Sequence, residues 1–288
     1  MLPIVLAVAC SPLKTFDRLV PKDRGGARVA EALSYGEGPR RMLDVYAPRA
    51  AAAQGGRPVV IFFYGGGWSS GTRSFYGFVG RALAARGFVT IIPDYRLVPE
   101  VRYPGFVEDG AAAVRWAQVH AGDYGGDPQR IVLVGHSAGA YIAAMLAVDE
   151  RWLGTAHGAI KGLVGLAGPY DFLPFDVEAS RAAFGGWPRP EETQPVSWAG
   201  AGDPPALLLV GDKDETVRPA NSEALAARLR AAGVPAEIRH YPGLGHIGLL
   251  TAIARPLRGR ADVLAETALF VDRVTKPAPA PAPAPVRR

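Results

Sequence analysis

The sequence GHSAG at 135–139 places Ser137 between two glycines. The motif follows the apolar run IVLV, and the helix-like stretch AGAYIAAMLA begins directly after Ser137. A strand, a glycine-flanked serine and a helix in this order are typical of a nucleophile elbow, a strained turn that lifts the serine oxygen above the edge of a sheet. Ser137 is therefore predicted to be a catalytic nucleophile. The alternative interpretation is a structural serine in a tight turn.

A serine hydroxyl needs a base that takes its proton and a carboxylate that orients the base. Downstream of Ser137, the segment GDKDETV offers Asp212 and Asp214 after the apolar run ALLLV, and GLGH offers His246. Asp214 is the predicted acid because it begins the pattern Asp-x-x-Val after a strand, whereas Asp212 is interpreted as shaping the turn through bonds to the backbone. His246 is the predicted base. The remaining histidines are interpreted as structural: His120, His136, His157 and His240.

Attack on a carbonyl creates a negatively charged oxygen, which must be met by preorganised donors. The segment YGGGW at 64–68 supplies a flexible glycine backbone after an apolar run. The backbone N–H groups of Gly66, Gly67 and Ala138 are the predicted donors. The alternative is a glycine turn without a function.

Strand and helix signals alternate along the chain. Short apolar runs typical of buried parallel strands lie at 58–65, 88–95, 130–135, 160–168 and 206–212. Helical patterns lie at 75–87, 106–122, 224–233 and 261–274. This order predicts a doubly wound α/β sheet with right-handed crossovers. The alternating segment MLDVYAP at 42–48 predicts an antiparallel edge strand.

The motifs FFYGGGW, PDYRLVPEVRYP, YGGDPQRIVLVGHSAGA, GDKDETV and GLGH resemble, in order and spacing, those of α/β-hydrolase esterases of the hormone-sensitive-lipase and acyl-ester or arylformamidase-like type. The resemblance spans about residues 43 to 274. It implies an α/β-hydrolase fold with a mostly parallel sheet of about eight strands, helices on both faces and a short lid. It also implies ester hydrolysis through an acyl-serine, without a metal or an organic cofactor. The family usually has a histidine where this chain has Tyr64, and the resemblance implies that this position braces the glycine loop rather than reacting.

The segment PDYRLVPE carries Asp94, Arg96 and Glu100. These residues are interpreted as a buried, charge-paired brace under the oxyanion loop, because arginine and a carboxylate form a directed pair. Polar contacts to the substrate are the alternative.

The aromatic, Pro- and Gly-rich stretch at 169–203 lies between two strand runs, where a lid is expected. Because it is short, it favours a moderately open apolar pocket for short acyl or aryl esters. Four aromatic residues are candidates for the pocket wall, with a place in the core as the equal alternative: Trp68, Tyr76, Tyr141 and Trp187.

Composition limits the number of domains, the class of partner and the chemistry of cysteine. A chain of 288 residues that is 49% hydrophobic fits one catalytic domain, predicted at 31–275. The 32 basic and 27 acidic residues are spread along the chain without a basic block, which argues against a nucleic acid as partner. The partner that the catalytic motifs predict is a small-molecule ester. The single cysteine excludes an internal disulfide and a cysteine metal cluster.

The two ends predict other properties. Residues 1–30 are interpreted as a leader and tether, in which Cys10 after Ala7, Val8 and Ala9 resembles the lipidated cysteine of a bacterial lipoprotein. This predicts a membrane tether at the bacterial cell envelope or periplasm; a cytoplasmic protein with a frayed apolar N-terminus is the alternative. Residues 276–288, KPAPAPAPAPVRR, predict an extended Pro/Ala-rich tail.

The predicted function is a serine carboxylesterase for short acyl or aryl esters. An arylformamidase or other amidase, a thioesterase and an acyltransferase share the acyl-serine intermediate and remain alternatives. A hydrolase-fold binding protein without turnover is a further alternative, and such a protein would normally lack one of the three catalytic residues.

Overall fold

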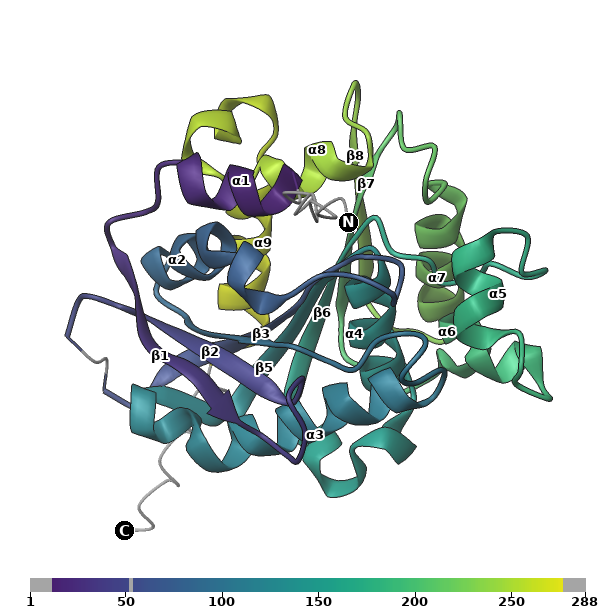
Figure 1. Cartoon of the computed structure of the whole chain (residues 1–288), viewed down its shortest axis with the longest axis horizontal. Helices are drawn as coiled ribbons and strands as arrows, with labels where there is room; N and C mark the ends of the chain where they lie inside the picture. The colour runs from purple at the N-terminus through teal and green to yellow at the C-terminus, as the bar shows by residue number, and fades with distance from the viewer. Residues whose placement is uncertain (1–11, 52–53, 277–288) are drawn as a thin grey trace, which may run out of the picture.

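The computed structural model describes residues 12–51 and 54–276 (Figure 1). Within these residues the chain forms one eight-stranded sheet in the order β1-β2-β4-β3-β5-β6-β7-β8. The strands are β1 (Gly26–Ser34), β2 (Met42–Pro48), β3 (Arg57–Phe63), β4 (Val89–Pro93), β5 (Gly126–His136), β6 (Ile160–Leu166), β7 (Ala206–Gly211) and β8 (Ala236–Tyr241). β1 and β2 are antiparallel to their neighbours, and the other pairs are parallel.

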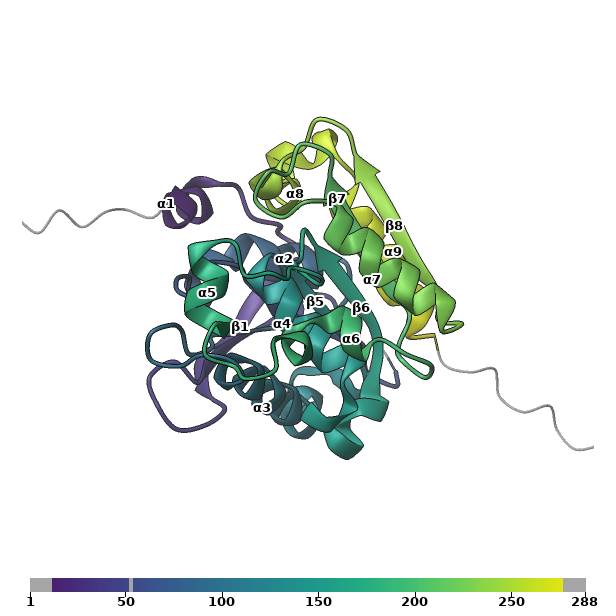
Figure 2. The ribbon, with the colours of Figure 1, turned by 90° about the vertical axis from the view of Figure 1, so that its right-hand side faces the viewer.

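Helices cover both faces of this sheet (Figures 1 and 2). α2 and α9 contact each other and lie on one face, while α3, α4, α6 and α7 follow one another across the opposite face. The described α-helices are α1 (Pro12–Leu19), α2 (Gly77–Ala85), α3 (Gly105–His120), α4 (Ala138–Val148), α5 (Glu178–Phe184), α6 (Pro195–Trp198), α7 (Ala220–Ala231), α8 (His246–Thr251) and α9 (Val263–Val274). The chain therefore has the predicted α/β-hydrolase fold, with a mostly parallel sheet between two helical layers.

The central strands explain the apolar runs of the sequence. Residues 59–63 of β3 and 131–136 of β5 are buried because helices cover both of their faces. β3 lies next to β5, so the loop that follows β3 and the turn that follows β5 emerge at the same edge of the sheet. Parallel strands thus bring segments far apart in sequence to one place.

The prediction of β2 as an edge strand was wrong in one respect. β2 is antiparallel to β4 as expected, but β1 pairs with its outer side and forms the edge of the sheet. β1 gave no clear sequence signal because most of its residues are exposed or half-buried and its register with β2 shifts twice. The middle of β2 is consequently buried, and the Tyr46 ring packs so closely on α2 that a side chain at Gly80 would meet it at 2.5 Å.

The predicted tether also needs correction. Residues 12–30 include α1 and the start of β1, so the folded domain begins well before residue 31. Phe16 of α1 packs edge-on against Phe78, with ring centroids 5.3 Å apart, and the Asp17 carboxylate accepts the Phe78 N–H at the start of α2. Asp23 forms an ion pair with Arg258, with one oxygen–nitrogen distance of 2.8 Å. These polar contacts were not visible in the sequence because their partners are distant along the chain.

Cys10 and all but the first residue of the predicted tail lie outside the described residues. Lipidation, the membrane tether and the extended tail therefore stay predictions. In the part of the chain that the structure describes, every helix is too short or too polar to cross a bilayer.

Candidate active site

Ser137 stands at the turn between β5 and α4 in a strained backbone conformation. Its φ of 54° and ψ of −126° are unusual for a residue with a side chain. A Cβ at Gly135 would lie 2.4 Å from the Gly139 carbonyl oxygen, and a Cβ at Gly139 would lie 2.1 Å from the carbonyl oxygen of Phe63. Both flanking glycines are therefore required for the elbow to form against β3.

The structure brings Ser137, His246 and Asp214 into one hydrogen-bonded chain. His246 Nε2 lies 2.8 Å from Ser137 Oγ, and His246 Nδ1 lies 2.8 Å from Asp214 Oδ2. The three residues come from the ends of β5 and β7 and from the start of α8. They are separated by 32 and 109 positions in sequence, so the order of the strands alone assembles them. This is the geometry of nucleophile, base and orienting acid.

The surroundings of Asp214 keep its carboxylate charged. Burial alone would raise the pKa of Asp214, but hydrogen bonds from His246 and from the N–H groups of Val217 and Thr216 outweigh burial, and the pKa is lowered. Both N–H groups donate to Oδ1 at 2.9 Å, which leaves Oδ2 for His246. Because the backbone of the following turn fixes the carboxylate, its free oxygen points at the base.

The interpretation of Asp212 as a turn-shaping residue was wrong. Its Oδ1 lies 2.8 Å from Nδ1 of His240 on β8, and both side chains are exposed. The turn is instead shaped by Asp214, which accepts two backbone N–H groups itself. The Asp-x-x-Val segment thus contains the predicted acid, and the side chain of this same residue also accepts the backbone N–H groups that form the turn.

Three other histidines lie away from Ser137 or face structural partners. His157 Nε2 lies 2.8 Å from the carbonyl oxygen of Ala147, and His120 lies beside Asp123. His136 is buried next to Ser137, and its Nε2 lies 3.1 Å from the carbonyl oxygen of His246.

The glycine loop after β3 runs past the nucleophile. A Cβ at Gly65 would lie 2.9 Å from Ser137 Cβ, so this backbone lies as close to the elbow as packing allows. Gly66 has a φ of +133° and Gly67 a φ of +57°, which let the loop reverse direction. Gly67 and Ala138 line the cavity that contains Ser137. The backbone on both sides of Ser137 is therefore close enough to meet a reacting carbonyl.

Tyr64 braces this loop from below. Its ring stacks between Tyr76 and Tyr95, with centroids 5.2 and 4.8 Å away. Its hydroxyl donates to Asp94 Oδ1 at 2.7 Å and accepts from Arg40 Nη2 at 2.9 Å. Burial raises the pKa of Tyr64 well above its usual value, so the hydroxyl keeps the proton that it donates. Tyr64, the first residue of the YGGGW segment, is thus hydrogen-bonded to two charged side chains, which hold the start of the loop in place.

The predicted charged brace exists with different pairs. Asp94 accepts hydrogen bonds from Arg73, whose Nε also donates to Asp44 Oδ1 at 2.7 Å. Arg96 does not pair with Asp94: its guanidinium donates to Asp109 on α3, with Nη2 and Oδ1 2.8 Å apart. Glu100 is exposed and takes no part among the described ion pairs. Sequence proximity suggested the wrong partners because Arg73 and Asp109 approach only after folding.

We predict that Tyr64→Phe lowers kcat/KM for a short-chain ester by roughly tenfold, since small displacements of catalytic groups have large kinetic effects. The ring stacking is kept, but Asp94 and Arg40 each lose one hydrogen-bond partner, so the thermal unfolding midpoint should fall by only a few degrees. The matched control is Tyr124→Phe, because Tyr124 lies in the short turn Ala121–Tyr124 outside the cavity. Equal rates in Tyr64→Phe and wild type would show that the hydroxyl does not brace the loop.

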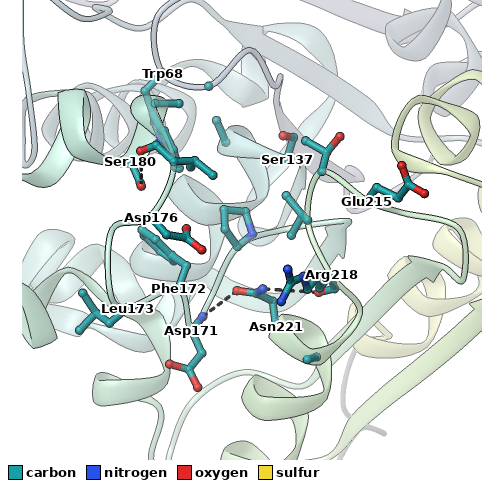
Figure 3. Close-up of a pocket in the computed structure, with 18 of the residues that line it drawn as sticks. Trp68, Ser137, Asp171, Phe172, Leu173, Asp176, Ser180, Glu215, Arg218 and Asn221 are labelled. Atoms are coloured by element: carbon teal, nitrogen blue, oxygen red, sulfur yellow. Dashed lines mark hydrogen bonds between the residues drawn. The ribbon is translucent and has the colours of Figure 1, made fainter.

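A cavity of about 390 Å³ opens over Ser137 (Figure 3). Its walls come from the glycine loop after β3, from the predicted lid between Pro169 and Ser180, and from the turn after β7 between Glu215 and Asn221. Of the four candidate aromatic residues, only Trp68 lines it. Tyr76 stacks under Tyr64, Tyr141 packs edge-on against Trp68, and Trp187 packs edge-on against Tyr103, so these three belong to the core, the alternative interpretation, and do not line the cavity.

Two amide side chains hold the start of the lid through three hydrogen bonds. Asn221 Oδ1 accepts the N–H group of Tyr170 at 2.9 Å and that of Asp171 at 3.0 Å, the second of which is drawn in Figure 3. Gln194 Oε1 accepts the Phe172 N–H at 2.8 Å. These amides hold the first residues of the lid over the cavity. No sequence signal marks them, since asparagine and glutamine are common on helices and loops.

Among the described residues, no group of three or more His, Cys, Asp or Glu side chains is arranged to hold a metal ion. The expectation that the chain needs no metal and no organic cofactor stays a prediction.

Comparison with known proteins places this site in a family. Residues 43–229, which include Ser137 and Asp214, match the family model BD-FAE. The chain belongs to the BD-FAE family. This BD-FAE chain is 32% identical over 272 residues to the probable isoprenylcysteine alpha-carbonyl methylesterase ICMEL1 of Oryza sativa subsp. japonica, covering 85% of this chain and 63% of that protein. Over 235 residues it is 28% identical to the esterase LipC of Mycobacterium tuberculosis, covering 74% and 58%.

The BD-FAE chain thus spans about 60% of the length of these curated relatives. Among solved structures, esterase 2 of Thermogutta terrifontis phosphorylated by paraoxon is 25% identical, with a TM-score of 0.72 over 90% of this chain and 98% of that one. A truncated carbohydrate esterase from gut microbiota gives a TM-score of 0.76 at 20% identity, covering 89% and 99%, and supports the fold alone.

Proposed function

We propose that this chain is a serine carboxylesterase that hydrolyses short-chain acyl or aryl esters through an acyl-serine intermediate. The observation that carries the proposal is the hydrogen-bonded chain from Ser137 through His246 to Asp214 at the floor of a cavity. Esterases among the relatives and structural neighbours support the same chemistry. Ser137 is the nucleophile, His246 the base and Asp214 the orienting acid.

Acylation follows from the positions of these atoms. Ser137 Oγ attacks the ester carbonyl carbon while its proton moves to His246 Nε2, 2.8 Å away. The carbonyl π electrons move to the oxygen, where the N–H groups of Gly66, Gly67 and Ala138 stabilise the charge. The carbon–oxygen bond to the leaving group then breaks, and the imidazolium of His246 returns its proton to the departing alcohol. Asp214 stabilises the imidazolium and stays ionised.

Deacylation uses the same groups in the opposite direction. A water molecule gives one proton to His246 Nε2 as its oxygen attacks the acyl carbon. The second tetrahedral intermediate collapses, the bond to Ser137 Oγ breaks, and the proton on His246 passes to the serine. The products are one carboxylic acid and one alcohol, and the enzyme is restored.

Cavity size and charge support a short substrate. At about 390 Å³ the cavity lies near the lower end of the range of roughly 300–1,000 Å³ typical of small-molecule sites. Three carboxylates lie around it, from Asp171, Asp176 and Glu215, against the single guanidinium of Arg218 (Figure 3). A long acyl chain leaving the cavity would desolvate these charges, which is unfavourable.

We predict a steep fall of kcat/KM with acyl length in p-nitrophenyl esters, from the best short ester to the hexadecanoyl ester by roughly 10²-fold or more, since unfavourable contacts of a few kcal/mol correspond to such ratios. An acyl-CoA thioester and N-formylkynurenine belong in the same panel. A preference for either over every simple ester would replace the carboxylesterase assignment by a thioesterase or an arylformamidase. A flat dependence on chain length would contradict the limit set by the cavity.

A further inference from the structure

His136 lies beside both the nucleophile and the base. It is the last residue of β5, directly before Ser137, and only 2% of its surface is exposed. Its ring centroid lies 4.7 Å from that of His246, and its Nε2 lies 3.1 Å from the main-chain oxygen of His246. On its other side, Nδ1 lies 3.0 Å from the position that a Cβ at Gly65 would occupy. One buried ring therefore touches the base and borders the glycine loop.

The hydrogen bond fixes the tautomer of His136. A carbonyl oxygen only accepts, so Nε2 must carry a proton. Burial, and secondarily the neighbouring His246, lower the pKa of His136 to about 3, so the ring is neutral at neutral pH and Nδ1 carries no proton. Among the described residues Nδ1 has no hydrogen-bond partner. His136 thus uses its single N–H group to hold the backbone of the residue that serves as base.

This contact links the base to the nucleophile by a second route. His246 begins α8 after the glycine-containing turn GLGH, and the helix is only six residues long. Its side chain is held by Asp214 and Ser137, whereas its backbone is held by His136. Because His136 and Ser137 are consecutive, any movement at the end of β5 displaces these two partners of His246 together.

We propose that His136 is a positioning residue whose Nε2–H, bonded to the His246 carbonyl, keeps the imidazole of His246 in line with Ser137 Oγ. The inference rests on the proposed function, since it concerns the base of that reaction. The competing interpretation is a histidine that only fills space in the core. The two interpretations predict different effects on the kinetics and the stability when the N–H group is removed.

Loss of the hydrogen bond is expected to act on kcat. His246 transfers a proton in both acylation and deacylation, and a displacement of about 1 Å can cost roughly 10²-fold in rate. His136 is not among the residues that line the cavity, so KM should stay close to the wild-type value. A space-filling residue would show lower stability with unchanged kinetics in the folded fraction.

The test compares His136→Met with His136→Gln in the full chain, using a short-chain p-nitrophenyl ester. The glutamine amide nitrogen reaches the position of Nε2 and can donate, whereas methionine has the same length and no donor. We expect kcat to fall by roughly 10- to 100-fold in His136→Met with KM within about threefold of wild type. His136→Gln should recover kcat to within about fivefold of wild type.

Two outcomes would overturn the inference: wild-type kcat in folded His136→Met, or equal losses in the methionine and glutamine variants. If the methionine variant does not fold, His136→Asn takes its place, because its shorter amide cannot reach the His246 carbonyl, and the same comparison with glutamine decides. Wild-type protein without turnover of any ester would count against the proposed function instead, so the two failures are distinguishable.

Discussion

Replacing Ser137 with alanine is expected to lower kcat/KM for a short-chain p-nitrophenyl ester by roughly 10⁴- to 10⁶-fold, as in other enzymes whose triads act as a unit. Ser137 Oγ is the atom that would form the bond to the substrate, and among the described residues it is the hydrogen-bond partner of His246 Nε2, at 2.8 Å. The elbow itself is formed by backbone and glycines, so the variant should fold. Steady-state kinetics and a thermal unfolding curve measure both properties.

The matched control for Ser137→Ala is Ser197→Ala. Ser197 is exposed on α6 and lies outside the cavity, so its removal should leave both activity and stability unchanged. If folded Ser137→Ala kept turnover comparable to that of Ser197→Ala, another residue would have to be the nucleophile.

The second large effect is expected at the acid. Asp214→Asn should lower kcat by roughly 10⁴-fold, because an amide in place of the carboxylate favours the wrong tautomer of the histidine and cannot stabilise its cation. Asp212→Asn is a close control: the same chemical change two residues earlier affects only an exposed contact with His240. Its kcat should remain within about threefold of wild type, as for most surface substitutions.

Kinetics of both aspartate variants on one ester would decide between the two residues. Equal losses, or a larger loss in Asp212→Asn, would contradict the assignment of the acid. Loss of folding in Asp214→Asn is not expected, because the remaining Oδ1 can still accept the N–H groups of Thr216 and Val217.

The sequence was sufficient to predict that Ser137, Asp214 and His246 come together, because each stands in a short motif at the end of a strand. In a parallel sheet such ends meet at one edge, so local motifs in the right order predict a common site. The glycines around Ser137 were informative for the same reason: the close approaches at Gly135 and Gly139 leave no space for a side chain. Motifs of this kind encode backbone geometry, which is local.

Other features depend on contacts between distant segments and could not be predicted. β1 is half-exposed and bulged, so its residues show neither a buried run nor a regular alternation. Asp94 pairs with Arg73 and Arg96 pairs with Asp109, although oppositely charged residues lie nearer to each of them in the sequence. Tyr141 lies outside the cavity wall because it packs edge-on against Trp68 and Phe184 in the core. Side-chain partners of this kind follow only from tertiary packing.

Tyr64 illustrates both sides of this limit. The family resemblance implied a bracing role for this position, and the buried hydroxyl bridges Asp94 and Arg40. The identity of these partners required the structure, since Arg40 precedes the loop by 24 residues and Asp94 follows it by 30.

The most direct test of the central claim is covalent labelling by paraoxon, which phosphorylates the related esterase 2 of Thermogutta terrifontis. Peptide mass spectrometry should find one diethylphosphoryl group on Ser137 in the wild-type protein, with loss of activity in proportion to labelling. Ser137→Ala should take up none. Inactivation accompanied by a label on any other residue, or full labelling of Ser137 with turnover undiminished, would contradict the account.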